Sequence, residues 1–164
     1  MRARLAVAAS GVQVELREIL LRDKAPEFLT SSPKGTVPVL VTRSKVIEES
    51  FDVMRWALAQ SDPEQWLDMP AVGYHWIARC DGPFKQALDH TKYAVRYPDI
   101  DPLHERYQTS EFLKDLDIQI AKSEWMFGPD CKLVDIAVLP FIRQFANIDK
   151  TWFDKQPWPN LQRW

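Results

Sequence analysis

The segment Val37-Pro38-Val39 is the first place in the chain where the residue types suggest contact with a ligand. A proline that opens a β-rich run has no N–H to give to a neighbouring strand. With a cis bond before Pro38, the backbone N–H and C=O of Val37 turn outward, where a peptide-like ligand pairs with them as an extra strand. With a trans bond, Pro38 is an ordinary edge-strand residue, and the spacing alone favours this second interpretation.

Glu48-Glu49-Ser50 is the second segment of this kind, and it stands between a predicted strand and a predicted helix. The Ser50 hydroxyl and the free N–H groups of a helix N-terminus suit a carboxylate, whereas Glu49 suits an ammonium group. Together they would hold the head group of an amino acid and bind its two charges separately. Taken alone, the segment is better explained as an N-cap at Ser50 preceded by a solvated acid.

The elements that position these two segments follow from local patterns. An alanine-rich helix is predicted over residues 1–10, with Gly11 as its stop, and the alternation over residues 12–17 predicts a strand. A short helix about residues 26–31 and a turn at Pro33-Lys34-Gly35 follow. Residues 36–42 and 45–48 are predicted to pair as an antiparallel hairpin because the link between them is short. A helix over residues 51–60 completes this part.

The rest of the chain has the pattern of an all-α domain. Residues 61–70 contain two prolines and three acids and are predicted to be a linker. Four helices are predicted after it, over residues 71–80, 84–97, 102–122 and 133–147. Asp81-Gly82-Pro83 is expected to break the first two apart, and Pro140 to kink or break the fourth. The third carries a candidate apolar stripe of Leu103, Tyr107, Phe112, Leu113 and Leu116. We therefore expect an α/β domain over residues 1–61 and a helical domain over 70–164.

Composition excludes several classes of function. The 164 residues carry a net charge of −2, so nothing favours nucleic acid or an anionic membrane surface electrostatically. Cys80 and Cys131 are too few for a disulfide scaffold, and a reducing cytoplasm is expected. No apolar run approaches the length of a membrane helix, and the start is better explained as a helix than as a secretory signal. His75, His90 and His104 lack the spacing of metal ligands, and the seven tryptophans are expected to pack in the core.

Taken jointly, the two segments and their spacing resemble a known family. Residues 33–40, 46–50 and 54–58 are similar to the glutathione-binding half of glutathione S-transferases. Residues 133–140 are similar to the family's buried helix, whose usual form is Ser/Thr-x-x-Asp followed by an apolar run. Residues 81–85 and 141–145 resemble a bacterial subgroup of the family. The resemblance covers nearly the whole chain.

This resemblance implies a thioredoxin-like N-terminal domain and an all-α C-terminal domain. In the family the Val-Pro bond is cis, and the backbone at the position of Val37 pairs with the cysteinyl part of glutathione. The Glu-Ser pair, here Glu49 and Ser50, holds the γ-glutamyl group. Pro38 belongs to the same site. Glutathione would act as co-substrate, a small electrophile would be the second substrate, and the usual assembly is a homodimer.

The sequence departs from the family pattern before the first predicted helix. The family's domain begins with a β-strand, and a catalytic Tyr, Ser or Cys follows it; no such strand is recognised here, so no catalytic residue is assigned. Ser10 lies at the wrong end of its helix, and both cysteines lie outside the thioredoxin-like part. That strand would lie between residues 12–17 and residues 37–42. We therefore expect either a shortened N-terminus or another segment that fills the gap.

Lys132 is a second departure, because the family's capping Ser or Thr occupies this position. Lysine has no acceptor for helix N–H groups, although Asp135 is still able to accept a bond from a preceding amide. The sequence thus predicts a glutathione S-transferase-like protein that conjugates or reduces a small electrophile, with its status as an enzyme left open by the unassigned catalytic residue. The alternatives are a non-catalytic binding or scaffold protein on the same fold, with an incomplete glutathione site, and an unrelated α+β domain.

Overall fold

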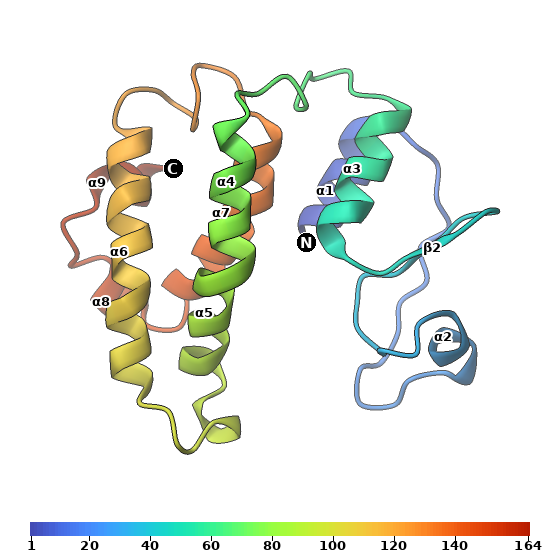
Figure 1. Cartoon of the computed structure of the whole chain (residues 1–164), viewed down its shortest axis with the longest axis horizontal. Helices are drawn as coiled ribbons and strands as arrows, with labels where there is room; N and C mark the ends of the chain where they lie inside the picture. Colours follow the sequence, from blue (N-terminus) through green and yellow to red (C-terminus); the bar gives the residue numbers. More distant parts are fainter. The chain divides into compact units, whose positions relative to one another are not determined.

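Helices make up most of the computed structural model, which describes residues 1–164 without a gap (Figure 1). The chain divides into two units, Met1–Leu67 and Asp68–Trp164. None of the helices combines the length and the apolar character that a membrane span requires.

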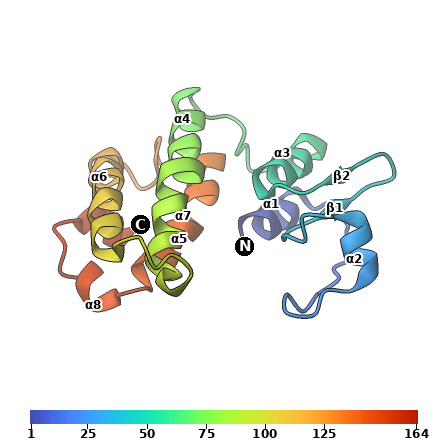
Figure 2. The same ribbon diagram turned by 60° about the horizontal axis from the view of Figure 1, so that its bottom comes forward.

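In the first unit, helices α1 (Arg2–Ser10) and α3 (Ser50–Gln60) pack side by side, as Figures 1 and 2 both show. Ala3 and Ala6 are buried on α1, and such small side chains let a second helix approach closely. Gly11 ends α1 in the left-handed region at φ 70°, and its N–H donates to the Ala8 carbonyl over 3.1 Å. The predicted helix and its glycine stop are therefore confirmed.

A hairpin joins α2 (Pro26–Ser31) to α3. Strand β1 (Leu40–Val41) pairs antiparallel with β2 (Val46–Ile47), with Leu40 opposite Ile47. The Thr42 hydroxyl accepts from the Lys45 amide over 3.0 Å and closes the turn. Ile47 and Leu40 pack with residues of α1 and α3, so the hairpin shares the core of this unit. The predicted hairpin and the short helix are confirmed, although the strands are shorter than the sequence pattern indicates.

The predicted strand over residues 12–17 does not form. This segment has no partner strand, and the nearest bridge joins Leu20 to Asp23. Val14 and Leu16 are 45% and 62% exposed. A strand is stabilised by ladder hydrogen bonds and by packing of one face, and this segment has neither. Alternation of apolar and polar residues identified a possible strand, but it carries no information on a partner.

In the second unit, α4 (Val72–Arg79), the π-helical turn η1 (Cys80–Phe84) and α5 (Lys85–Lys92) follow one another without interruption. The predicted break at Asp81-Gly82-Pro83 is therefore wrong. Proline removes one hydrogen bond of the helical ladder, and the wider π turn accommodates that loss while the helix continues. Helix α5 ends at Lys92, earlier than the predicted end at residue 97, and a short 3-10 turn, η2 (Ala94–Arg96), follows it.

Helix α6 (Pro102–Ile120) packs beside α5 (Figures 1 and 2). The Asp101 side chain caps it by accepting from the Leu103 amide over 2.9 Å. Phe112, Leu113 and Leu116 are buried as predicted, but Leu103 and Tyr107 are about two-thirds exposed. The predicted stripe therefore holds only in the second half of the helix.

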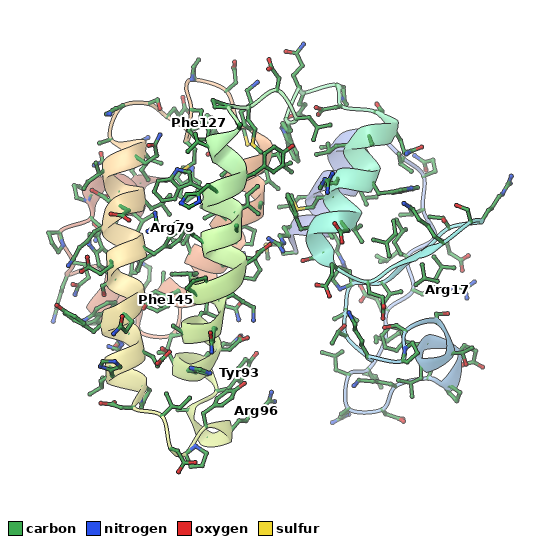
Figure 3. The ribbon with its side chains drawn as sticks, in the orientation of Figure 1. Arg17, Arg79, Tyr93, Arg96, Phe127 and Phe145 are labelled. Atoms are coloured by element: carbon green, nitrogen blue, oxygen red, sulfur yellow. The ribbon has the colours of Figure 1, made fainter.

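Helix α7 (Leu133–Ala146) supplies the largest share of the buried residues in this unit, and it continues through Pro140 without the predicted break. Phe84 lies 4.9 Å from Phe112 and 5.6 Å from Phe145, measured between ring centroids. Figure 3 shows Phe145 among the helices of this unit and Arg79 turned toward α6, where its guanidinium meets Asp115 at 2.5 Å. Helices α8 (Lys150–Phe153) and α9 (Pro159–Arg163) follow, and α9 contacts α6.

Candidate functional site

The register of the hairpin brings the two candidate segments together. Leu40 faces Ile47, so Pro38 precedes that pair by two residues on one strand and Glu49 follows it by two on the other. Both segments therefore leave the hairpin at the same, open end. Val37 and Pro38 arrive there from the turn after α2, and Ser50 begins α3.

A part-buried hydrogen bond ties the two arms of this end together. The hydroxyl of Ser32, which is fully buried, donates to the Glu48 carboxylate over 2.6 Å. Gly35 then turns the chain at φ 62°, and its N–H donates to the Ser32 carbonyl. A Cβ at Gly35 would lie 3.1 Å from the Lys24 ammonium nitrogen, so the turn is tightly packed as well as left-handed. The predicted turn is confirmed, whereas the bond to Glu48 was not foreseen.

Val37 presents an unpaired stretch of backbone. The peptide bond before Pro38 is cis, which corrects the trans bond favoured by spacing alone and agrees with what the family resemblance implies. Val37 is 50% exposed, and its backbone N–H and C=O make no hydrogen bond within the chain. An extended ligand backbone is able to pair with such groups.

Glu49 carries the exposed acid of the site. Its carboxylate lies 3.4 Å from the Lys34 ammonium, and both side chains are more than half exposed. Its backbone is extended, and its carbonyl accepts from the Val53 amide, so Glu49 occupies the N-cap position of α3. The expectation that Ser50 is the N-cap is therefore wrong, because Ser50 is already the first helical residue. Neither side chain caps the helix.

The N-terminus of α3 is consequently rich in hydrogen-bond donors. The amides of Ser50, Phe51 and Asp52 have no partner within the chain, as is usual for the first turn of a helix without a side-chain cap. The Ser50 hydroxyl accepts from Nε of Arg2 over 3.0 Å. These groups, with the partial positive charge of the helix end, suit an anion such as a carboxylate.

Arg2 is the residue of this site that sequence reasoning missed. It is only 7% exposed, and its guanidinium lies 5.8 Å from the centre of the Phe51 ring, within the range of a cation–π contact. A signal was present, because an arginine in the first turn of a helix opposes the helix dipole and needs a reason to be there. The bond to Ser50 across 48 residues supplies that reason.

The groups at this end of the hairpin suit ligand binding, and no catalytic nucleophile is identified among them. Residues 1–67 contain neither Cys nor Tyr. The Ser10 hydroxyl donates to the Val7 carbonyl over 2.8 Å and lies at the C-terminal end of α1. Cys80 and Cys131 belong to the second unit. No residue described here is assigned a catalytic role.

Asp135 is the most deeply buried acid of the second unit. Its carboxylate accepts from the Met126 amide over 2.8 Å and from the Lys132 amide over 2.9 Å. Burial raises the pKa of Asp135, and the two amide hydrogen bonds offset part of that rise. Asp135 thus accepts a hydrogen bond from the Lys132 amide as expected, and α7 begins there although the Lys132 side chain has no capping oxygen.

The other possible sites in the structure have less support as functional sites. A shallow cavity of about 640 Å³ is lined by residues 121–125 and by Asn160, Arg163 and Trp164, and it includes none of the four predicted site residues. No group of three or more His, Cys, Asp or Glu side chains is arranged to hold a metal ion. His90 is largely buried and pairs with Glu105 at 3.0 Å, so it is not the exposed helix histidine that was expected.

The fold defines a class of protein: a small α/β unit that carries the candidate site at the open end of its hairpin, followed by a helical unit. The family profile described as "Glutathione S-transferase, N-terminal domain" matches residues 1–66. Glutathione S-transferase GstB of Escherichia coli is 29% identical over 154 residues, covering 84% of this chain and 71% of that protein. The probable glutathione S-transferase parA of Nicotiana tabacum is 26% identical, covering 91% and 69%.

Solved structures of the same class share the fold. The bacterial glutathione S-transferase BphK, solved as a ternary complex, gives a TM-score of 0.81 at 16% identity, covering 99% of this chain and 84% of that one. A glutathione transferase family member from Pseudomonas fluorescens, solved with two glutathione bound, gives 0.78 at 20% identity, covering 99% and 80%. Residues 1–66 thus match the N-terminal domain of glutathione S-transferases, and the chain shares the fold of these proteins, a thioredoxin-like N-terminal part followed by a helical C-terminal part.

Proposed function

We propose that this protein binds glutathione at the open end of the hairpin and uses it as the co-substrate of a transfer to, or a reduction of, a small electrophile. The observation that carries the proposal is that an unpaired peptide edge at Val37 and a separate cation-and-anion site at Glu49 and Ser50 leave the hairpin at the same end. The match of residues 1–66 to the glutathione S-transferase N-terminal domain and the structural neighbour solved with glutathione bound support this assignment.

Each part of glutathione has a matching group in this arrangement. The N–H and C=O of Val37 would pair with the cysteinyl backbone, next to Pro38. The exposed Glu49 carboxylate would accept from the α-ammonium of the γ-glutamyl residue. The Ser50 hydroxyl and the free amides of α3 would donate to its α-carboxylate. All of these groups are held by the first unit, for which we propose residues 1–61 as the binding domain.

The chemistry that glutathione supplies is that of its thiol. The thiolate attacks the electrophilic carbon of a small substrate, a carbon–sulfur bond forms, and a leaving group such as halide departs with its electron pair. The thiol proton passes to solvent. The residues described here bind and orient glutathione, and none of them is assigned to lowering the pKa of its thiol.

Further properties belong to the same proposal. We propose residues 70–164 as the helical domain that provides contacts for the electrophile, a homodimeric assembly, a cytoplasmic location and membership of the bacterial subgroup. The similarity to GstB of Escherichia coli supports the last of these. The alternative of a non-catalytic scaffold is not favoured, because the relatives and neighbours reported above are named as glutathione transferases.

Binding and turnover test the proposal separately. Isothermal titration with glutathione is expected to give saturable binding, and Ser50→Ala and Glu49→Gln are each expected to weaken it about tenfold, because each removes a hydrogen bond to a charged group. Ser44→Ala, in the hairpin turn, is the matched control and should leave the affinity unchanged. Turnover is measured with a chlorodinitrobenzene. Wild-type protein that neither binds glutathione nor consumes the electrophile would refute the proposal.

A further inference from the structure

We propose that the cavity beside the C-terminal end of α6 binds a ligand that joins a flat aromatic ring to a phosphate group, the chemistry of a nucleoside monophosphate. The cavity has a volume of about 640 Å³ and is lined by residues 121–125 and by Asn160, Arg163 and Trp164. This volume lies in the range of sites for small organic ligands. None of the residues assigned to glutathione lines the cavity, so this inference goes beyond the proposed function.

Hydrogen bonds fix the two walls of the cavity relative to each other. One wall is the loop after α6, and the other is α9 with the residue that follows it. One terminal nitrogen of Arg163 donates to the carbonyls of Ile120 and Ser123 over 3.1 and 3.2 Å. The Asp117 carboxylate on α6 accepts from the Asn160 side chain over 3.1 Å. The walls are therefore preorganised, which reduces the entropy cost of binding a ligand between them.

Each wall contributes one indole ring. The Trp125 amide donates to the Gly128 carbonyl over 3.0 Å, and the Trp125 carbonyl accepts from the Ser123 hydroxyl over 2.6 Å. The Trp164 amide donates to the Asn160 carbonyl over 2.9 Å. The backbone of both tryptophans is thus held in place at the cavity.

These two rings have no aromatic neighbour within the chain. Trp76, Trp152 and Trp158 each pack against another aromatic ring. Trp125 and Trp164 are only half-buried and make no such contact, so they depart from the core packing that was expected for the tryptophans. The π face of a purine or pyrimidine stacks on an indole of this kind.

The lining side chains also include two cations and one acid. The Lys122 ammonium makes no ion pair or hydrogen bond within the chain. Arg163 makes both of its hydrogen bonds through one nitrogen, so its other donors are free. A phosphate is able to accept from both cations, and the acceptors of Glu124 suit the hydroxyls of a ribose. The base, the phosphate and the sugar of a nucleotide each have a matching group here.

Three ligands separate the contributions of the ring and of the phosphate. Titration calorimetry on the full chain measures the Kd of adenosine monophosphate, of adenosine, which lacks the phosphate, and of ribose 5-phosphate, which lacks the base. Adenosine monophosphate is expected to bind about tenfold tighter than either fragment, because only this ligand engages both the indoles and the cations. Its affinity should fall between about 0.01 M and about 0.15 M salt, since the cations are exposed, whereas that of adenosine should not.

Two variants assign these contributions to residues. Lys122→Gln is expected to weaken adenosine monophosphate about fivefold and to leave adenosine unchanged, because it removes one charge. Lys155→Gln, at an exposed lysine outside the cavity, is its control. Trp125→Leu is expected to weaken adenosine monophosphate and adenosine alike and to leave ribose 5-phosphate unchanged. Tyr107→Leu, at an exposed ring of α6, is the control for the loss of an aromatic side chain.

Several results would overturn the inference. Adenosine monophosphate that fails to bind, that binds no tighter than either fragment, or that is unaffected by both variants would do so. Displacement by glutathione would do so as well, because the cavity shares no residue with the proposed glutathione site. If Trp125→Leu fails to fold, the indole N–H signals of the labelled wild-type protein decide. Those of Trp125 and Trp164 are expected to shift with the calorimetric Kd, and shifts confined to other tryptophans would contradict the proposal.

Discussion

The ammonium of Lys34 lies 3.4 Å from the carboxylate of Glu49, on the exposed side of the hairpin end. Without ligand, Lys34 thus pairs with the Glu49 carboxylate, the group that we propose to bind the ligand's ammonium group. An exposed pair of this kind contributes little to stability, about 0–1 kcal/mol, and salt screens it. Its consequence for binding is larger, because the ligand has to replace Lys34.

Removal of Lys34 is therefore expected to strengthen glutathione binding a few-fold without changing the stability of the fold. The gain should be greater at about 0.01 M salt than at about 0.15 M, because screening reduces the competition. Titration calorimetry on Lys34→Ala at both salt concentrations measures it. Lys114→Ala, which removes a comparable exposed pair in the second unit, is the control. Weaker binding by Lys34→Ala would show that Lys34 itself contacts the ligand.

Ser32→Ala is expected to destabilise the protein by about 1–3 kcal/mol, because it removes the hydroxyl that bonds to Glu48 inside a buried position. Urea unfolding followed by circular dichroism measures the free energy. Hydrogen exchange should also rise around Val37, since the bond links its arm to β2. Ser44→Ala is the exposed comparison, and an equal effect of both variants would contradict the role given to Ser32.

Gly35 and Gly11 form a matched pair of left-handed glycines. Alanine at either is expected to cost about 1–2 kcal/mol, because each has φ near 60–70°. A Cβ at Gly35 also meets the Lys24 side chain, whereas one at Gly11 meets nothing within 4 Å. Gly35→Ala should therefore weaken glutathione binding as well, and Gly11→Ala should not. Equal affinities of the two variants for glutathione would show that the turn at Gly35 does not contribute to the binding site.

The buried Asp135 predicts a specific pH dependence of stability. Because its folded pKa is raised above the usual 3.8, the folded protein holds the proton more tightly than the unfolded chain does. Its contribution to the free energy of unfolding is thus fully present below that value and is lost as the pH rises through the raised folded pKa. Asp135→Asn removes this dependence.

The variant is also expected to be less stable at low pH, by about 1–3 kcal/mol, since an amide satisfies only one of the Met126 and Lys132 donors. The difference in the free energy of unfolding between wild type and Asp135→Asn should therefore become smaller as the pH rises. Urea unfolding across the acid range measures it, with the exposed Asp130→Asn as control. A gap that widens with rising pH would contradict the assignment.

The elements that the sequence predicted correctly depend on local rules. Gly11 ends α1 because a left-handed residue is needed there, and the short link between the strands dictates an antiparallel hairpin. That pairing in turn places Pro38 and Glu49 at one end of the hairpin, so the closeness of the two candidate segments could be predicted from residues close in sequence.

The errors arose where distant residues decide the outcome. The strand predicted over residues 12–17 has no partner, and no local pattern reveals that. Asp81-Gly82-Pro83 was expected to separate two helices, but a π turn accommodates Pro83 and the helix continues. The contact of Arg2 with Ser50 joins residues 48 apart, so the packing of α1 on α3 had to be known first.

The central claim is that the peptide edge at Val37 and the N-terminus of α3 bind one glutathione molecule together. Titration of the isotope-labelled protein with glutathione, followed by amide NMR, tests it most directly. The account predicts saturable shifts with a single Kd at the amides of Val37, Ser50, Phe51 and Asp52. Shifts at only one of the two segments, or at neither while others move, would contradict it.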